Sequence, residues 1–127
     1  MLKAVIVDGN VLTRGLLNTV LTEGGYEVVG QAHTSSKGYA LAQKFHPHVI
    51  CIAREQMEDG AQVVAQIRAS LPKTLIFMVA GAIDAATLQT AMASGVQGFI
   101  VKPFKADAVL KTIRNTVLAI IRKQQGG

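Results

Sequence analysis

The stretch LKAVIVD at residues 2–8 decides the fold class of this chain. It is an almost unbroken aliphatic run of strand length, closed by Asp8. A strand without polar alternation is usually buried on both faces, as in a parallel sheet that helices cover from either side. The stretch therefore predicts the first strand of such a sheet.

Four more strands and five helices follow this strand. Strands are expected at 27–32, 48–53, 75–79 and 98–101, and helices from 11 to about 23, 36–44, 60–71, 82–94 and 105–123. Strands that alternate with helices indicate right-handed crossovers and one doubly wound α/β domain. We expect that domain over residues 1–123, with 27–32 as an edge strand, 54–58 as a loop, Asp59 as the cap of the next helix, and a flexible tail at 124–127.

The composition of the chain fits this picture. Half of its 127 residues are apolar and only 5% are aromatic, so the core is expected to be aliphatic and a disordered chain is excluded. Cys51 has no partner for an internal disulfide. The apolar runs are too short for a signal peptide or a bilayer crossing, which predicts a cytoplasmic protein with no membrane partner.

The basic charge does not by itself identify a partner. The net charge is +5, and the basic residues are spread thinly except in the last predicted helix. No run of five like charges occurs, and aromatic residues do not interleave with the basic ones, so a solvated face is favoured over a nucleic-acid surface. Binding of nucleic acid through the last helix is kept as an alternative.

Candidate functional residues lie just after the predicted strands, because ligands of doubly wound folds bind at the carboxyl ends of the strands. The segments concerned are Asp8-Gly9, Ala53-Arg54, Ala80-Gly81 and Lys102-Pro103. The histidines around Pro47 lack a third ligand at a suitable spacing, so no metal site is predicted there.

Several segments together resemble the receiver domain of response regulators, the CheY-like family of two-component signalling. They are Ala4–Asp8, Leu16-Leu17, Gly24–Val29, Pro47, Met57–Gly60, Ile67-Arg68, Ala93–Phe99 and Val101–Phe104. The resemblance covers residues 2 to about 121. It implies a flavodoxin-like (βα)5 domain with a five-stranded parallel sheet in the order 2-1-3-4-5, and a Lys102-Pro103 bond that is often cis in the family.

The resemblance also implies a phosphorylation site with specific residue types. Family members bind Mg²⁺ through two acids after the first strand, phosphorylate an aspartate on the third, and contact the phosphate through a Ser or Thr and a Lys. Here the first acid position falls on Asp8, but the second falls on Gly9, and the hydroxyl position falls on Ala80. The acceptor position falls on Ala53, or on Ile52 when counted back from Asp59. Only Lys102 matches the family at its position.

These departures predict a pseudo-receiver, meaning a receiver domain that lacks the phosphoacceptor aspartate. We expect no enzyme activity, no cofactor, and absent or weak binding of Mg²⁺. Asp8 is expected to pair with Lys102, while Arg54 fills the vacated pocket and pairs with Asp8 as a further hypothesis. Glu55 is read as a solvated residue or as a mimic of a phosphorylated acid.

The function expected from the sequence is that of a stand-alone signalling protein in a two-component system that acts by protein–protein interaction. Partners are a histidine kinase, an effector or a second copy, bound at the face of the fourth helix, the fifth strand and the fifth helix. The residues proposed for that face are Thr87, Thr90, Ala91, Phe99, Lys105, Lys111 and Arg114. The alternatives are phosphorylation of Asp59 or Glu55, and binding of nucleic acid.

Overall fold

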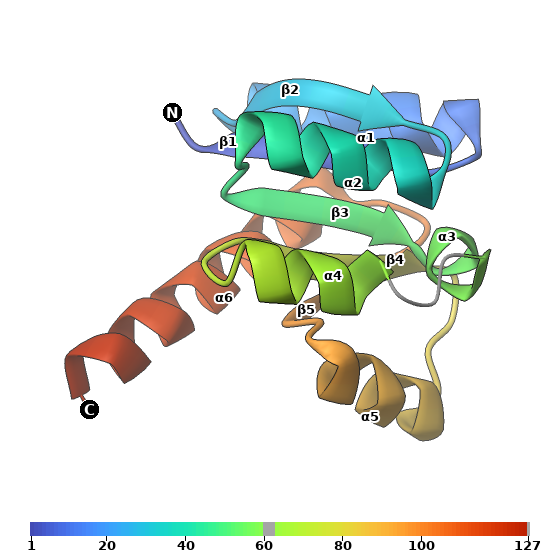
Figure 1. Ribbon diagram of the computed structural model, residues 1–127. Coiled ribbons are helices and arrows are strands. Elements are labelled where there is room, and N and C mark those ends of the chain that lie inside the picture. Colours follow the sequence, from blue (N-terminus) through green and yellow to red (C-terminus); the bar gives the residue numbers. More distant parts are fainter. Residues whose placement is uncertain (60–62, 127) are drawn as a thin grey trace.

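The computed structural model describes residues 1–59 and 63–126, in which strands and helices alternate. Figure 1 shows their arrangement. The elements are β1 (Lys3–Val7), α1 (Val11–Glu23), β2 (Glu27–Ala32), α2 (Ser35–Phe45), β3 (Val49–Ala53), α3 (Arg54–Asp59), α4 (Val63–Ser70), β4 (Leu75–Ala80), α5 (Ala85–Ser94), β5 (Gly98–Val101) and α6 (Ala106–Gly126).

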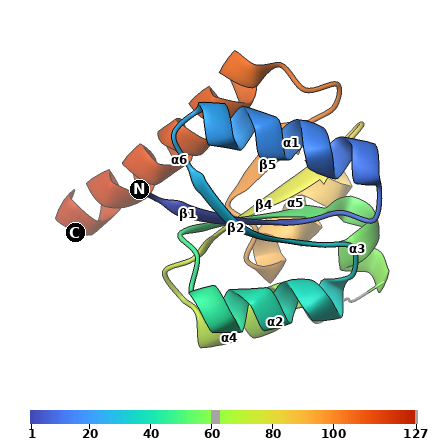
Figure 2. The same ribbon diagram turned by 90° about the horizontal axis from the view of Figure 1, so that it is seen from above.

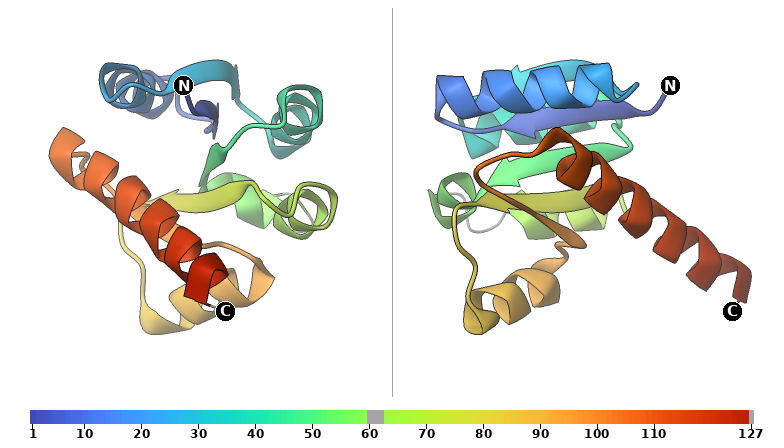
Figure 3. Two further views of the ribbon diagram at one scale, coloured as in Figure 1. Left: turned by 90° about the vertical axis from the view of Figure 1, so that its left-hand side faces the viewer. Right: turned by 180° about the vertical axis from the view of Figure 1, so that it is seen from behind.

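The five strands form one parallel sheet in the order β2-β1-β3-β4-β5. Helices α1 and α6 cover one face of the sheet, and α2 and α4 cover the other (Figures 2 and 3). The doubly wound architecture, the strand order and the position of β2 at an edge are all confirmed.

The core is split by the sheet into two hydrophobic clusters. In β1, Val5 and Val7 belong to the cluster under α2 and α4, whereas Ala4 and Ile6 belong to the cluster under α1 and α6. Successive side chains of a strand point to opposite faces, so a strand buried on both sides needs apolar residues at every position. All residues of β3 and β4 are buried, which explains the unbroken aliphatic runs in the sequence.

The helix ends follow the capping chemistry of the sequence. The Oδ1 atom of Asn10 accepts hydrogen bonds from the backbone N–H groups of Leu12 and Thr13, which makes Asn10 the N-cap of α1. Gly95 ends α5 with a φ of 118°, a left-handed conformation that residues with a side chain rarely adopt.

The prediction for the segment after β3 was wrong. Residues 54–58 were expected to form a loop, but Arg54–Asp59 form the short helix α3 directly after β3. Its residues Arg, Glu, Gln and Met are all strong helix formers. The predicted capping role of Asp59 depends on residues 60–62 and lies outside the described residues.

Helix α6 is longer than expected. It continues to Gly126, past its expected end near Lys123, and its last turns project beyond the sheet (Figures 1 and 3). The flexibility proposed for residues 124–127 stays a prediction. Within the described residues, no helix combines the length and the hydrophobicity needed to cross a membrane.

Candidate functional site at the carboxyl edge of the sheet

The segments singled out after the strands do meet at one edge of the sheet. Val7 pairs with Ile52, Ala53 pairs with Val79, and Ala80 pairs with Val101, so the ends of the four neighbouring strands are aligned. This alignment places Asp8, Ala53, Ala80 and Lys102 along a common edge.

Two of the four positions carry only a methyl group. Ala53 is the last residue of β3 and Ala80 is the last residue of β4, and each is 1% exposed. Neither side chain has an oxygen that can attack a phosphoryl group, bind a cation or donate a hydrogen bond. At these two positions the edge is apolar and closed to solvent.

The carboxylate of Asp8 is held by its own turn. Its Oδ1 atom accepts a hydrogen bond from the backbone N–H of Asn10 at 2.8 Å, and its backbone carbonyl accepts one from Nη1 of Arg14, also at 2.8 Å. Asp8 is 5% exposed. The ion pair expected between Asp8 and Lys102 does not form among residues 1–59 and 63–126, because the Asp8 side chain turns toward the start of α1.

Gln56 is a residue of the edge that the sequence did not point to. It lies on α3, and its Oε1 atom accepts a hydrogen bond from the backbone N–H of Gly9 at 3.1 Å. A Cβ atom on Gly9 would lie 3.2 Å from the Nε2 atom of Gln56. The side chain therefore occupies space that the missing side chain of Gly9 leaves open.

The side chain of Arg54 points away from the vacated pocket at the strand ends instead of filling it. Its Nη1 atom donates to the backbone carbonyl of Ala82 at 3.0 Å, and its Nη2 atom lies 3.4 Å from Oγ1 of Thr87 at the start of α5. The proposed pairing with Asp8 is wrong, because the guanidinium group is turned toward the segment between β4 and α5. Glu55, the next residue, is exposed on α3.

The remaining candidate residues have structural roles. Cys51 is fully buried, and burial raises the pKa of its thiol to about 12, so the reactive thiolate is absent near neutral pH. His46 caps α2 in a left-handed conformation, and Nδ1 of His48 accepts the backbone N–H of Lys3 at 2.9 Å. The Lys102-Pro103 peptide is cis, as the resemblance implied.

The residues predicted for the interaction face differ in their exposure. Lys105, Lys111 and Arg114 are exposed on or just before α6. Thr87, Thr90 and Ala91 instead line a cavity between α5 and α4, and Ala91 belongs to the hydrophobic core. Phe99 is partly buried against that same cluster. Of these residues Ala91 is buried, whereas Thr90 and the three cations are accessible to a partner.

Asp84 caps α5, a role that the sequence analysis missed because it placed the start of this helix at Ala82. The carboxylate accepts the backbone N–H of Thr87 at 2.7 Å. That hydrogen bond lowers the pKa of Asp84 below its ordinary value of 3.8, and the charge of Arg54 acts in the same direction. The signal that reveals such a cap is an Asp or Asn directly before an apolar helix, where its side chain can accept a backbone N–H two or three residues further on.

The low pKa of Asp84 predicts how the start of α5 responds to acid. Because the pKa is lower in the folded than in the unfolded chain, the cap stabilises the fold above the unfolded pKa and is lost as the pH falls through the folded pKa. The amide resonance of Thr87 should therefore titrate with a midpoint below 3.8 in an NMR pH series. In the Asp84→Asn variant this transition should disappear, and a midpoint at or above 3.8 in the natural chain would contradict the capping geometry.

The fold and this edge together define a doubly wound α/β domain whose candidate site lies at the carboxyl ends of the strands. A family model for the response regulator receiver domain matches residues 4–114. The chain belongs to the response regulator receiver domain family.

Individual relatives agree with this assignment. The chemotaxis protein CheY of Listeria monocytogenes is 29% identical over 114 residues, which cover 89% of this chain and 96% of that protein. The structure of the chemotaxis response regulator CheY4 of Vibrio cholerae matches with a TM-score of 0.81 and 28% identity, covering 91% of this chain and 98% of that one. The fold, at 18% identity, also matches a chain in the crystal structure of the CheX-CheY-BeF3-Mg+2 complex from Borrelia burgdorferi, with a TM-score of 0.84 and coverage of 91% of this chain and 89% of that one.

Proposed function

We propose that this chain is a pseudo-receiver that acts in two-component signalling by protein–protein contact, without phosphorylation of an aspartate at the carboxyl edge of the sheet. The observation that carries the proposal is the buried methyl group of Ala53 at the end of β3. Phosphoryl transfer needs an oxygen nucleophile in line with the donor. Removing that nucleophile removes the covalent step whatever the rest of the edge retains.

The donor set for a cation supports the same proposal. Mg²⁺ prefers six hard oxygen ligands in an octahedron. At this edge the described side chains offer the carboxylate of Asp8, one of whose oxygens already accepts the N–H of Asn10. Gly9 and Ala53 supply no side-chain oxygen. The residues present do not fit a magnesium site of the kind that receiver domains use.

The partner-binding face is proposed to lie on α5, β5 and α6. Its exposed apolar residues are Leu88 and Met92 on α5 and Val101 on β5. Leu88 and Met92 are four residues apart, so they form one ridge on the helix surface. The exposed cations Lys111 and Arg114 lie on α6, the next helix in the chain, which packs against β5. A partner of matching chemistry presents an apolar strip flanked by acidic side chains, on a kinase, an effector or a second copy of this chain.

The proposal is tested by NMR with acetyl phosphate and with beryllofluoride, each in the presence of Mg²⁺. A receiver with an acceptor aspartate, run in parallel, should show large shifts around its acceptor. In this chain we expect the amide resonances of Asp8–Asn10, Ala53, Ala80 and Lys102 to stay unchanged. Saturable shifts confined to these residues would reject the proposal, and shifts centred on Glu55 or Asp59 would establish an unusual acceptor in its place.

A further inference from the structure

The small residues of helix α5 face the domain, and its large apolar residues face solvent. Leu88 is 37% exposed and Met92 is 55% exposed, and Ala91 is the buried residue of the helix. The residues of α5 that face the domain are Ala86, Thr87, Thr90, Ala91 and Ser94. Such small side chains cannot fill the space between the helix and its neighbours.

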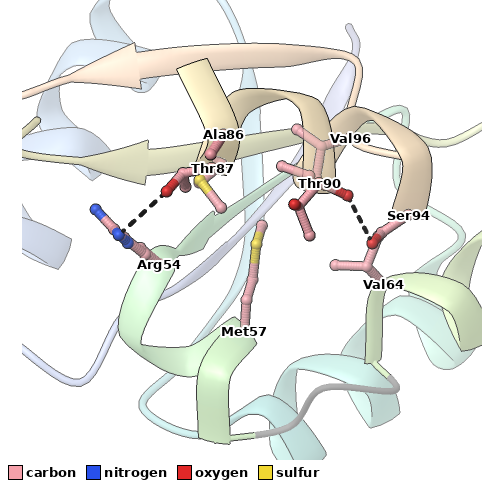
Figure 4. Close-up of a pocket in the computed structure, with 10 residues that line it drawn as sticks. Arg54, Met57, Val64, Ala86, Thr87, Thr90, Ser94 and Val96 are labelled. Atoms are coloured by element: carbon pink, nitrogen blue, oxygen red, sulfur yellow. Dashed lines mark hydrogen bonds between the residues drawn. The ribbon is translucent and has the colours of Figure 1, made fainter. Parts of the chain in front are cut away.

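A cavity of about 410 Å³ therefore lies between α5, α3, α4 and β4 (Figure 4). Its apolar lining comes from four different elements or loops: Met57, Val64, Met78 and Val96. Two of these four are methionines, whose flexible thioethers adapt to ligands of different shapes. The volume falls within the range of pockets that hold small organic molecules.

The polar groups of the cavity are gathered on one wall and at its mouth. Thr87, Thr90 and Ser94 occupy one stripe of α5, and the hydroxyl of Ser94 donates to the backbone carbonyl of Thr90 at 3.0 Å (Figure 4). Arg54 stands at the start of this stripe, where the bond of its Nη1 to Ala82 fixes its direction. The contact of its Nη2 with Thr87 is long, at 3.4 Å, and an incoming acceptor of higher charge can replace it.

We propose that this cavity binds a small amphipathic anion. Its apolar body would lie against Met57 and Met78, and its carboxylate or sulfonate group would lie at Arg54 and Thr87. None of the described lining residues is acidic. The carboxylate of Asp84, which interacts with the charge of Arg54, is outside the lining and accepts the backbone N–H of Thr87. A guanidinium group stays protonated at all ordinary pH values and offers donors in a planar fork suited to a carboxylate or sulfonate. Binding here does not depend on the absence of phosphotransfer, so this proposal and the pseudo-receiver proposal can fail separately.

The test uses two fluorescent probes of similar body and different charge: 8-anilinonaphthalene-1-sulfonate and the neutral N-phenyl-1-naphthylamine. The sulfonate should bind with one-to-one saturation and shift the amide resonances of Arg54, Met57, Val64, Thr87, Thr90 and Val96. Because hydrogen bonds to a charged group are the stronger kind, the Arg54→Gln variant should weaken sulfonate binding about tenfold. Binding of the neutral probe should remain within about twofold of the natural chain.

A matched pair of variants on α5 separates the cavity from the outer surface of the helix. Thr90→Leu adds bulk to the wall of the cavity and should weaken both probes at least about tenfold. Ala93→Leu adds similar bulk to the same helix at an exposed position outside the lining and should leave both affinities unchanged. Shifts that map to the Leu88–Met92 ridge or to α1, fluorescence that does not saturate, or equal effects of the two variants would overturn the proposal.

Discussion

Replacing Phe77 with alanine should lower the free energy of unfolding by about 3–5 kcal/mol. The ring is fully buried in the cluster under α1 and α6, and it is the largest side chain among the fully buried residues of the described part of the chain. Its removal leaves a cavity in the middle of β4, where the flanking strands limit collapse. Urea denaturation followed by circular dichroism measures the loss.

The same ring makes Gly98 a position at which a side chain is costly. A Cβ atom at Gly98 would lie 2.5 Å from Cε1 and 2.6 Å from Cδ1 of Phe77, closer than real Cβ atoms come to a neighbour. Gly98→Ala alone should therefore destabilise the domain by about 1–3 kcal/mol through overpacking.

The double variant should cost less than the sum of the two single ones, because the new methyl group enters the space that the ring leaves. Leu118→Ala, at a residue that is 41% exposed on α6, serves as the control and should cost less than about 1 kcal/mol. Strict additivity of Gly98→Ala and Phe77→Ala would show that the ring does not sit over Gly98.

Restoring two carboxylates at the edge of the sheet should create a response to magnesium. In the Gly9→Asp/Ala53→Asp variant, three acids meet at the ends of β1 and β3, with Lys102 directly after β5, two strands away from β3. Gly9 has no left-handed backbone conformation, and the atoms nearest to its missing Cβ belong to the flexible end of Gln56, so a side chain fits there once Gln56 moves. Without a cation the three acids repel one another and destabilise the fold.

Magnesium should reverse that loss. At a concentration one hundred times its dissociation constant, a ligand bound only to the folded state stabilises it by about 2.7 kcal/mol. Thermal unfolding with and without Mg²⁺ measures the gain, and beryllofluoride should then shift the resonances of the new Asp at position 53. Gly9→Asn/Ala53→Asn has similar shape without the charge and should not respond to Mg²⁺. A natural chain that already gains stability from Mg²⁺ would contradict the account of this edge.

The sheet was the part of the fold most completely predictable from sequence, because burial on both faces leaves a plain signal. The runs at Val49–Ala53 and Leu75–Ala80 have no polar residue, and few other structures accept that pattern. Helix α3 left no such signal. It is six residues long, too short to show a hydrophobic period, and it follows β3 without a capping residue.

The chemical types at the site were predictable, but the directions of its side chains were not. The positions of Asp8, Ala53, Ala80 and Lys102 follow from strand ends, whose alignment a parallel sheet enforces. The contact of Gln56 with Gly9 depends on how α3 is rotated, and forty-seven residues separate the two partners. Arg54 turned away from Asp8 for a similar reason, since backbone acceptors near α5 lie within its reach.

The two clusters on either side of the sheet limit how a signal can cross the domain. Met78 touches the cavity under α5, whereas its chain neighbours Phe77 and Val79 belong to the opposite cluster, beneath α1 and α6. A molecule lodged beside Met78 has no direct contact with the packing of α6. Because β4 pairs with β5 and α6 packs against β5, a small displacement of these two strands would link the cavity mechanically to α6.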